Sequence, residues 1–291
     1  MNLSFVFRIA GRIDFGRAPA HKRWPGTLPL TRPTIPNMAR NTTSARPRRN
    51  QPRSENSNRD SKFSGLLRRA LRLAGWVMLG LILLILLLRF VPPPTSAFML
   101  VRHVERLFDT PPGPAIMYSW TPMDAIPAHM ALAVVAAEDQ NFPRHFGFDL
   151  DAIARAMEHN EKQHTVRGAS TISQQVAKNL FLWSGRSYVR KGLEAGLTVL
   201  IETLWSKKRI LEVYLNIAEF GDGTYGVGAA ARRFYGKTPD RLTRQEAALL
   251  AAVLPSPRRL SAQRPSPYLW QRANWVQTQM RQLGTSYVDL R

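Results

Sequence analysis

The sequence contains no cysteine among its 291 residues. Catalysis by a thiolate, zinc sites built from cysteine, and disulfide bonds are therefore all excluded. Histidine is also scarce, with six residues, and none of them stands in a His-Glu-x-x-His pattern. A dedicated transition-metal site is therefore not expected. Acidic residues are few as well, with 20 Asp and Glu against 41 Lys and Arg, which gives a formal net charge of +21.

Much of the positive charge lies near the N-terminus. Residues 1–72 hold 16 Lys and Arg against 3 Asp and Glu, and the rest of the chain holds 25 against 17. The beginning of the chain is rich in Arg, Pro, Ser and Asn, and such a segment buries too little apolar area to offset the entropy lost on ordering. We therefore expect residues 1–69 to be a disordered basic tail. Nucleic-acid binding is not predicted, because no known nucleic-acid module accompanies the charge.

A long apolar run follows this tail. Residues 73–88 contain no charged side chain, and Arg72 and Arg89 at its ends can extend their charged groups to a membrane surface. With these flanks the run reaches the roughly 20 residues that cross a bilayer, so we expect one transmembrane helix over residues 70–91. Because basic residues are concentrated before the run, the N-terminus is expected in the cytoplasm and the later chain outside. Residues 92–125, which prolines interrupt, are expected to form a juxtamembrane connector.

From residue 126 onward nearly every segment has helical periodicity. We therefore expect residues 126–291 to form one domain that is all-α or nearly so. No strand is predicted, because no segment alternates for more than a few residues. The predicted helices begin near residues 149, 171, 187, 207, 229, 243 and 267. Apolar side chains that share a helical face are expected to point inward, and they are Ile153 and Met157, then Ile172, Val176, Leu180 and Trp183, then Leu193, Leu197, Leu200 and Leu204.

Glycine residues stand at two points of this domain. Gly192 and Gly196 are expected to permit the close approach of another helix. The glycine-rich segment 221–228 has two interpretations. It is either a loop whose backbone approaches a ligand or a flexible turn between helices.

Two carboxylates end the first helix of the domain. Residues 130–137 are uncharged, so Glu138 and Asp139 fall in the last turn of a buried helix. A helix C-terminus carries negative partial charge and burial disfavours a charged carboxylate, so a raised pKa and a role in proton transfer are one interpretation. A salt-bridged helix end explains the pair equally well.

Polar side chains form a row on the helix that begins near residue 171. Thr171, Gln175 and Lys178 are spaced i, i+4, i+7. The row is either a solvent-facing surface or a set of donors for an anionic, oxygen-rich ligand. On the next helix, Arg190 and Glu194 are spaced i, i+4, which is also the spacing of an ordinary surface ion pair.

Four segments carry a resemblance to a known family. They are Glu138-Asp139-x-x-Phe142-x-x-His145-x-Gly147, then Gly168-Ala169-Ser170-Thr171-Ile172-Ser173-Gln174-Gln175-Val176-Ala177-Lys178-Asn179, then Arg190-Lys191-x-x-Glu194, then Ile210-Leu211-Glu212-x-Tyr214-Leu215-Asn216. In their order and spacing they closely resemble the signature motifs of the peptidoglycan glycosyltransferases, over residues 125–260. The chain most resembles the monofunctional biosynthetic branch, because no Ser-x-x-Lys motif of a penicillin-binding domain follows. Ala169 stands where many relatives have a second glycine.

The resemblance implies a lysozyme-like, mainly α glycosyltransferase domain that polymerises lipid II, a lipid-linked disaccharide-pentapeptide, into β-1,4-linked glycan strands. It implies an inverting transfer in which Glu138 removes the proton from the 4-hydroxyl of the acceptor sugar and a polyprenyl diphosphate leaves. Glu194 is implied as a second catalytic acid, near the donor or its diphosphate. Substrate-binding roles are implied for Asp139, Phe142, His145, Ser170, Thr171, Gln174, Gln175, Lys178, Asn179, Arg190 and Lys191.

The resemblance also implies a cellular setting. It predicts no tightly bound cofactor, although Mg²⁺ or Mn²⁺ at the diphosphate is compatible with it. The expected partners are lipid II, the growing glycan strand, the membrane and proteins of cell-wall synthesis or division. The expected location is the bacterial inner membrane, crossed once, with the N-terminus cytoplasmic and the catalytic domain periplasmic.

Two alternative functions remain open at this point. A lytic transglycosylase or muramidase of lysozyme-like fold also centres on one glutamate, but it breaks glycan and has no need for the basic side chains of Lys178, Arg190 and Lys191. A non-catalytic membrane anchor, whose basic tail binds nucleic acid or anionic lipid, is the alternative outside enzymes.

Overall fold

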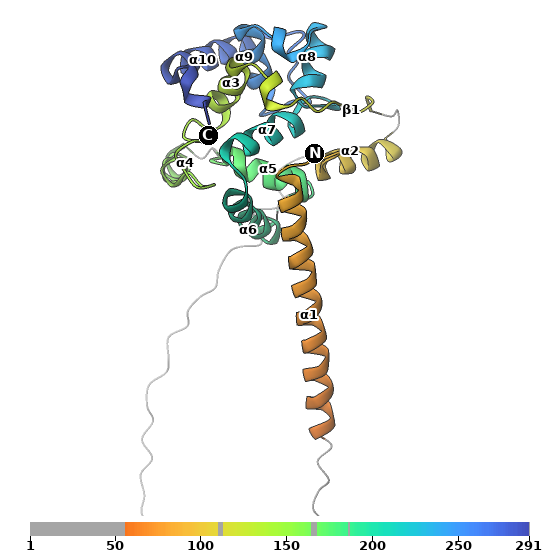
Figure 1. Ribbon diagram of the computed structural model, residues 1–291. Helices are drawn as coiled ribbons and strands as arrows, with labels where there is room; N and C mark the ends of the chain where they lie inside the picture. The colour runs from red at the N-terminus through yellow and green to blue at the C-terminus, as the bar shows by residue number, and fades with distance from the viewer. Residues whose placement is uncertain (1–55, 110–112, 164–167, 186, 291) are drawn as a thin grey trace, which may run out of the picture. The chain divides into compact units, whose positions relative to one another are not determined.

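The computed structural model describes residues 56–109, 113–163, 168–185 and 187–290. Most of these residues are helical (Figure 1). The α-helices are α1 Asn56–Leu88, α2 Ala97–Phe108, α3 Ala128–Glu138, α4 Leu150–Gln163, α5 Ile172–Phe181, α6 Tyr188–Leu204, α7 Lys207–Ile217, α8 Val227–Tyr235, α9 Arg244–Val253 and α10 Pro267–Leu283. The strands are β1 Met117–Tyr118, β2 Glu219–Gly221 and β3 Thr224–Tyr225. The expected mainly α fold is confirmed.

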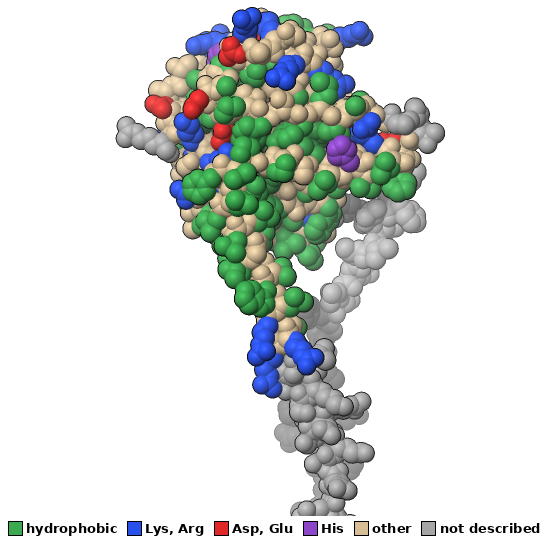
Figure 2. Space-filling view, turned by 45° about the vertical axis from the view of Figure 1, so that its right-hand side comes forward, with side chains coloured by type: hydrophobic (Ala, Val, Ile, Leu, Met, Phe, Trp, Pro, Cys, Tyr) green, Lys and Arg blue, Asp and Glu red, His purple; other side chains and the backbone are tan. Residues whose placement is uncertain are grey.

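Helix α1 contains the predicted membrane segment. Its part Leu67–Leu88 is long and apolar enough to cross a membrane. Figure 2 shows hydrophobic side chains along this part and basic side chains where it begins. The helix starts at Asn56, so residues 56–69 are helical where a disordered tail is expected. No proline stands between Pro52 and Pro92, and extending a formed helix costs little compared with starting one. The rest of the predicted tail, residues 1–55, lies outside the described residues.

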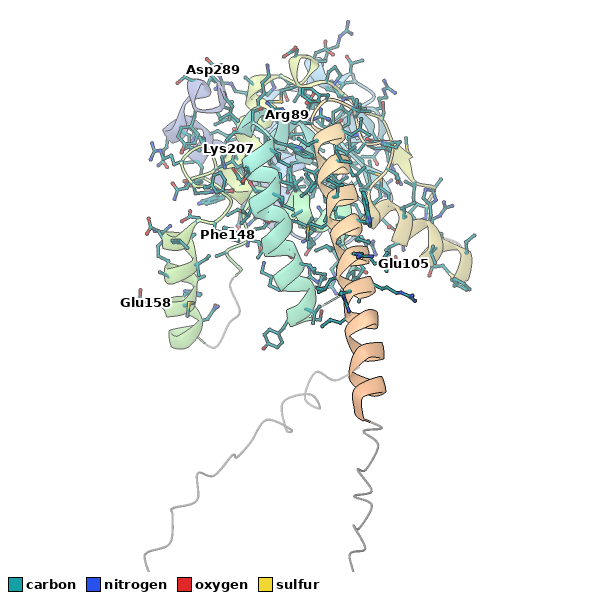
Figure 3. All side chains as sticks on the ribbon, turned by 60° about the horizontal axis from the view of Figure 1, so that its bottom comes forward. Arg89, Glu105, Phe148, Glu158, Lys207 and Asp289 are labelled. Carbon is teal, nitrogen blue, oxygen red and sulfur yellow. The ribbon has the colours of Figure 1, made fainter. Side chains whose placement is uncertain are left out.

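The C-terminal end of α1 is fastened to the α6–α7 connection. The Trp205 indole donates a hydrogen bond to the Ile85 carbonyl oxygen at 2.8 Å, and Arg209 donates to the Leu88 carbonyl oxygen at 2.7 Å. Arg89 donates in return to the Leu204 carbonyl oxygen at 2.8 Å. The Leu88 and Leu204 carbonyl groups are the last of their helices and lack partners within them, so the two arginine side chains satisfy them. Figure 3 shows α1 beside α6, with Arg89 at the end of α1.

The core of the domain surrounds α3. All residues from Met130 to Ala136 are buried, and α3 packs against both α9 and α10, which also pack on each other (Figure 1). Alanines are frequent in α3 and α9, so these helices can approach closely and fill the space at the high density of protein interiors. The consequence is a helix that is packed on several sides and ends at Glu138.

A small sheet of strand order β1-β3-β2 was not predicted. Its strands have two or three residues, too few to show alternation. Gly226 beside it has a φ of +83°, and a side chain there would start 2.6 Å from the Asn216 carbonyl oxygen. A side chain on Gly228 would start 2.5 Å from the Thr121 hydroxyl oxygen. These glycines are required by internal packing, so the interpretation as a ligand-approaching loop is not needed to explain them.

Several residues expected to pack inward are exposed. Met157 on α4 is 61% exposed, Leu193 on α6 is 48% exposed, and Trp183 lies beyond the end of α5 and is also exposed. A side chain added at Gly192 or Gly196 would meet no atom within 4 Å, so the expected close helix approach is wrong. Periodicity identifies an apolar face, but it does not tell whether that face is covered by the protein.

Candidate active site

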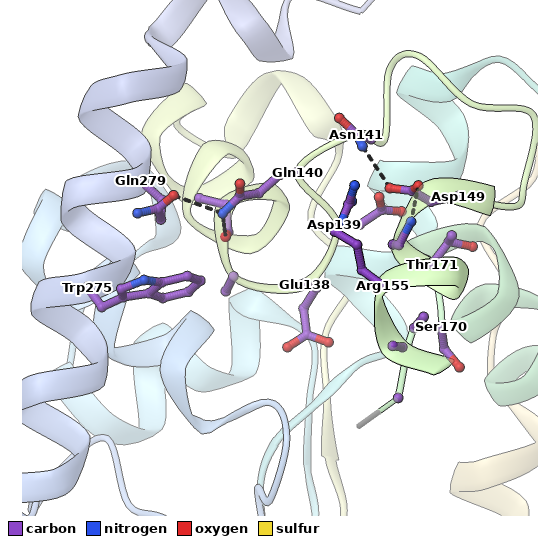
Figure 4. Close-up of a pocket in the computed structure, with 16 residues that line it drawn as sticks. Glu138, Asp139, Gln140, Asn141, Asp149, Arg155, Ser170, Thr171, Trp275 and Gln279 are labelled. Carbon is purple, nitrogen blue, oxygen red and sulfur yellow. Dashed lines mark hydrogen bonds between the residues drawn. The ribbon is translucent and has the colours of Figure 1, made fainter. Parts of the chain in front are cut away.

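Glu138 is the last residue of α3 and lines a cleft with a volume of about 570 Å³. Figure 4 shows its carboxylate pointing into this cleft, between Trp275 on one side and Ser170 on the other. Burial raises the pKa of Glu138, and the neighbouring Asp139 raises it further. Hydrogen bonding by Gln175 and the charges of Arg272 and Lys178 lower it. The expected raised pKa at this helix end therefore has a physical cause, which is desolvation.

Asp139 follows Glu138 but points into the protein. Its carboxylate lies 3.0 Å from the His145 Nε2 atom and accepts a hydrogen bond of 2.9 Å from the backbone N–H of Ile172. It thus joins the end of α3 to the start of α5. His145 packs edge to face on Phe142, which has no exposed surface and carries the Lys207 ammonium 4.6 Å above its ring. Asp139, Phe142 and His145 thus support the loop after Glu138.

The start of α5 uses two of the predicted substrate-binding residues for its own structure. The Thr171 hydroxyl donates to the Gly147 carbonyl oxygen at 2.6 Å and accepts from the Gln174 backbone N–H. The Gln174 side chain accepts in turn from the Thr171 backbone N–H, which completes a capping box. Ser170, one residue earlier, is exposed and lines the cleft. The predicted polar row is therefore divided, since Thr171 is buried at the wall of the cleft while Gln175 and Lys178 line the cavity on the other side.

Gln175 connects Glu138 to Tyr214, a residue of the fourth motif that was not among the predicted site residues. Its side-chain N–H group donates to the Glu138 Oε2 atom at 2.9 Å, and its oxygen accepts from the Tyr214 hydroxyl at 3.1 Å. Burial raises the pKa of Tyr214 well above its usual value, so the hydroxyl keeps the proton that it donates. Tyr214 therefore fixes the orientation of the Gln175 amide, so that the NH₂ group of Gln175 points toward Glu138. Its place in the Ile-Leu-Glu-x-Tyr motif was the available signal.

Lys178 and Asn179 line a second cavity of about 410 Å³, on the other side of Gln175. Burial lowers the pKa of Lys178; the charge of Glu194 opposes this effect, while those of Arg190 and Lys191 add to it. The Asn179 side-chain oxygen is buried and has no hydrogen-bond partner among the described residues. The Lys178 side chain therefore lines a cavity that shares Gln175 with the site of Glu138, the candidate catalytic carboxylate.

The Arg190–Glu194 pair is not the ordinary exposed ion pair that its i, i+4 spacing also predicts. Only 3% of Glu194 is exposed, and its carboxylate accepts from the Arg190 guanidinium at 2.9 Å and from the Lys191 ammonium. Because Lys191 is itself half exposed, the cluster presents positive charge around a buried acid. The structure thus brings together the three basic residues that the motifs indicated.

A metal ion has few ligands to use here. Among the residues that the structure describes, no group of three or more His, Asp or Glu side chains is arranged to hold one. Glu194 is already paired with two cations, and Asp139 is paired with His145. These residues do not fit a cation held by protein carboxylates alone.

The C-terminal helix contributes residues that the motifs missed. Trp275 and Gln279 of α10 line the cleft, and Gln279 accepts a hydrogen bond of 3.1 Å from Gln140 (Figure 4). Arg272 lines an adjoining cavity together with Glu138. The signal in the sequence was a polar and aromatic stripe at helical spacing, which also fits plain surface.

Comparisons with known proteins identify the family of this chain. Residues 112–281 match the family model described as Transglycosylase. The chain belongs to this transglycosylase family. It is 56% identical over 219 residues to the biosynthetic peptidoglycan transglycosylase of Pseudomonas fluorescens Pf-5, covering 75% of this chain and 91% of that protein. It is 52% identical to the protein of that name from Xanthomonas campestris strain B100, over 77% and 94% of the two chains. The resemblance to the peptidoglycan glycosyltransferases is confirmed, and the chain is an enzyme of that class.

Proposed function

We propose that this protein polymerises lipid II into β-1,4-linked glycan strands of peptidoglycan. The observation that carries the proposal is a partly buried carboxylate with a raised pKa, Glu138, which lines an open cleft. It is hydrogen-bonded to Gln175, which also lines the cavity that contains Lys178. Such a carboxylate can take a proton from a sugar hydroxyl, and the adjacent ammonium can stabilise a diphosphate.

The proposed reaction is a direct displacement. The acceptor 4-hydroxyl oxygen attacks the anomeric carbon of the donor, Glu138 receives the hydroxyl proton, and the bond from the anomeric carbon to the diphosphate oxygen breaks with its electron pair. Attack opposite to an α-linked diphosphate inverts the centre and gives a β bond. The polyprenyl diphosphate gains negative charge as it leaves, which Lys178, Arg190 and Lys191 are suited to stabilise.

Supporting residues have separate tasks in this proposal. Gln175 orients the Glu138 carboxylate, and Asp139 fixes the loop that follows it. Glu194 keeps Arg190 and Lys191 in position, close enough to Lys178 to influence its charge. A divalent cation would be held mainly by diphosphate oxygens, so no step is assigned to it.

The membrane segment suits a lipid-linked substrate. Part of α1 is long and apolar enough to cross a bilayer, and the excess of Lys and Arg before it favours a cytoplasmic N-terminus. In this proposal the catalytic domain lies outside the bacterial inner membrane, in the periplasm. An enzyme and a lipid held in one bilayer meet at a raised effective concentration.

The experiment that tests the proposal compares synthesis with cleavage. Full-length protein in detergent is incubated separately with lipid II and with mature glycan strands. We expect polymer from lipid II and no cleavage of mature strands. Cleavage of strands without polymer formation would support the lytic alternative.

A further inference from the structure

Helix α10 has a polar and aromatic stripe next to its core stripe. Leu269, Ala273, Val276 and Met280 are the buried residues of this helix. The residue before each of them is turned by about 100° to one side of the core stripe. Those four residues form the α10 track, which consists of Tyr268, Arg272, Trp275 and Gln279.

The α10 track begins beside Glu138 and leads away from it. Trp275 lines three adjoining cavities of about 570, 410 and 430 Å³. Glu138 lines the first two, while Tyr268 and Arg272 line the third. Figure 4 shows Trp275 and Gln279 on the same side of the cleft, with the Trp275 ring extending toward Glu138 and the Gln279 side chain toward Gln140. The track therefore extends the site in a direction that none of the family motifs covers.

The side chains of the track offer flat apolar surface and one cation, Arg272, whose charge also acts on Glu138. Trp275 is 46% exposed and Tyr268 is 59% exposed. The Arg272 guanidinium has no hydrogen bond or ion pair with any residue in the described ranges, and its buried Nε atom is unpartnered. A guanidinium binds carboxylates through two parallel hydrogen bonds. An aromatic ring offers an apolar face to the carbon–hydrogen side of a sugar ring.

We propose that the α10 track binds sugar units of the glycan, on the opposite side of Gln175 from the cavity that contains Lys178. Trp275 stacks on an amino-sugar ring, and Arg272 binds a carboxylate carried by the sugar or its peptide. The identity of the ligand rests on the proposed function. Two molecules share this chemistry, namely the disaccharide of lipid II and a strand that is already polymerised.

The test measures binding without turnover. The full chain with Glu138→Gln is the parent, and its dissociation constants are measured for lipid II and for lipid-free glycan oligosaccharides. Trp275→Leu keeps an apolar side chain but removes the flat ring. Trp275→Tyr keeps a ring. Trp270→Leu is the matched control, because Trp270 is a partly exposed tryptophan of the same helix that lines none of these cavities.

We expect Trp275→Leu to weaken binding of at least one probe by roughly five- to tenfold, in line with the usual contribution of aromatic stacking. Trp275→Tyr should stay within about twofold of the parent, and Trp270→Leu should be unchanged. Loss for the oligosaccharide alone assigns the track to the polymerised strand, and loss for lipid II alone assigns it to the incoming disaccharide. Either result supports the proposal.

Two results would overturn it. One is a Trp275→Leu protein that binds both probes as tightly as the parent. The other is an equal loss in Trp270→Leu, which would indicate a general effect on α10. A parent protein that binds neither probe would instead contradict the proposed function, so the two failures are distinguishable. Thermal unfolding of each variant shows whether the helix is intact.

Discussion

The hydrogen bond from Gln175 to Glu138 controls the ionisation of the proposed base. The Gln175 amide donates to the carboxylate at 2.9 Å. Burial raises the pKa of Glu138, and this bond is the foremost of the interactions that lower it. Gln175→Met keeps the length of the side chain and removes the donor. The variant should therefore need a higher pH than the wild type to ionise Glu138.

The size of the effect follows from the bond. A hydrogen bond to an ionised group contributes about 1.5–3 kcal/mol, and about 1.4 kcal/mol is a factor of ten. At low pH, where Glu138 is mostly protonated in both proteins, kcat/KM of Gln175→Met should be roughly 10- to 150-fold lower than that of the wild type. At high pH, where Glu138 is ionised in both proteins, the difference should shrink.

The assay is lipid II polymerisation across a pH series. Tyr214→Phe should move the acid limb in the same direction but less, because the Gln175 amide remains and only loses the hydroxyl that orients it. Gln263→Met, a change at an exposed residue away from the cleft, should leave the profile unchanged. An equal loss for Gln175→Met at every pH would refute the reasoning, since it would show a defect unrelated to Glu138 ionisation.

Three further predictions concern charge, backbone and metal. Lys178→Ala should lower kcat by about 100- to 1,000-fold, the usual cost of losing one preorganised donor. The control is Lys208→Ala, which removes an exposed lysine paired with Asp124 and should leave kcat unchanged. Similar kcat values for the two variants would contradict the role of Lys178 at the diphosphate. Gly226→Ala should destabilise the fold by more than Gly236→Ala, measured as melting temperature, because only the former meets backbone atoms at 2.6 Å. EDTA, which removes divalent cations, should lower turnover by less than Lys178→Ala does. The reason is that Arg190 and Lys191 already neutralise Glu194, so this carboxylate does not need a metal ion. A complete loss of turnover that Mg²⁺ restores would contradict this prediction.

The sequence predicted the parts of the site that depend on local rules. The end of α3 at Glu138 followed from an uncharged run, and the starts of α5 and α6 followed from Thr171 and Ser187, which are the observed capping residues. These outcomes depend on neighbouring residues only, so one sequence contains the information.

Other features depend on which distant segments meet. Asp139 binds the backbone of α5, 33 residues later, and Gln175 meets Tyr214 of α7. Arg272 and Trp275 reach the cleft because α10 packs on α3. The periodicity of a single segment does not predict contacts between segments that are far apart in the sequence. The exposure of Leu193 and Trp183 was missed for the same reason, since an apolar face shows no sign of whether another element covers it.

The most direct test of the central claim is lipid II polymerisation by Glu138→Gln. The change keeps the size of the side chain and removes its ability to accept the proton. We predict an unchanged melting temperature and a fall in turnover of about 100- to 10,000-fold, the range contributed by a general base, while Asp240→Asn, at an exposed residue, stays at the wild-type rate. Turnover by Glu138→Gln within a few-fold of the wild type would contradict the account.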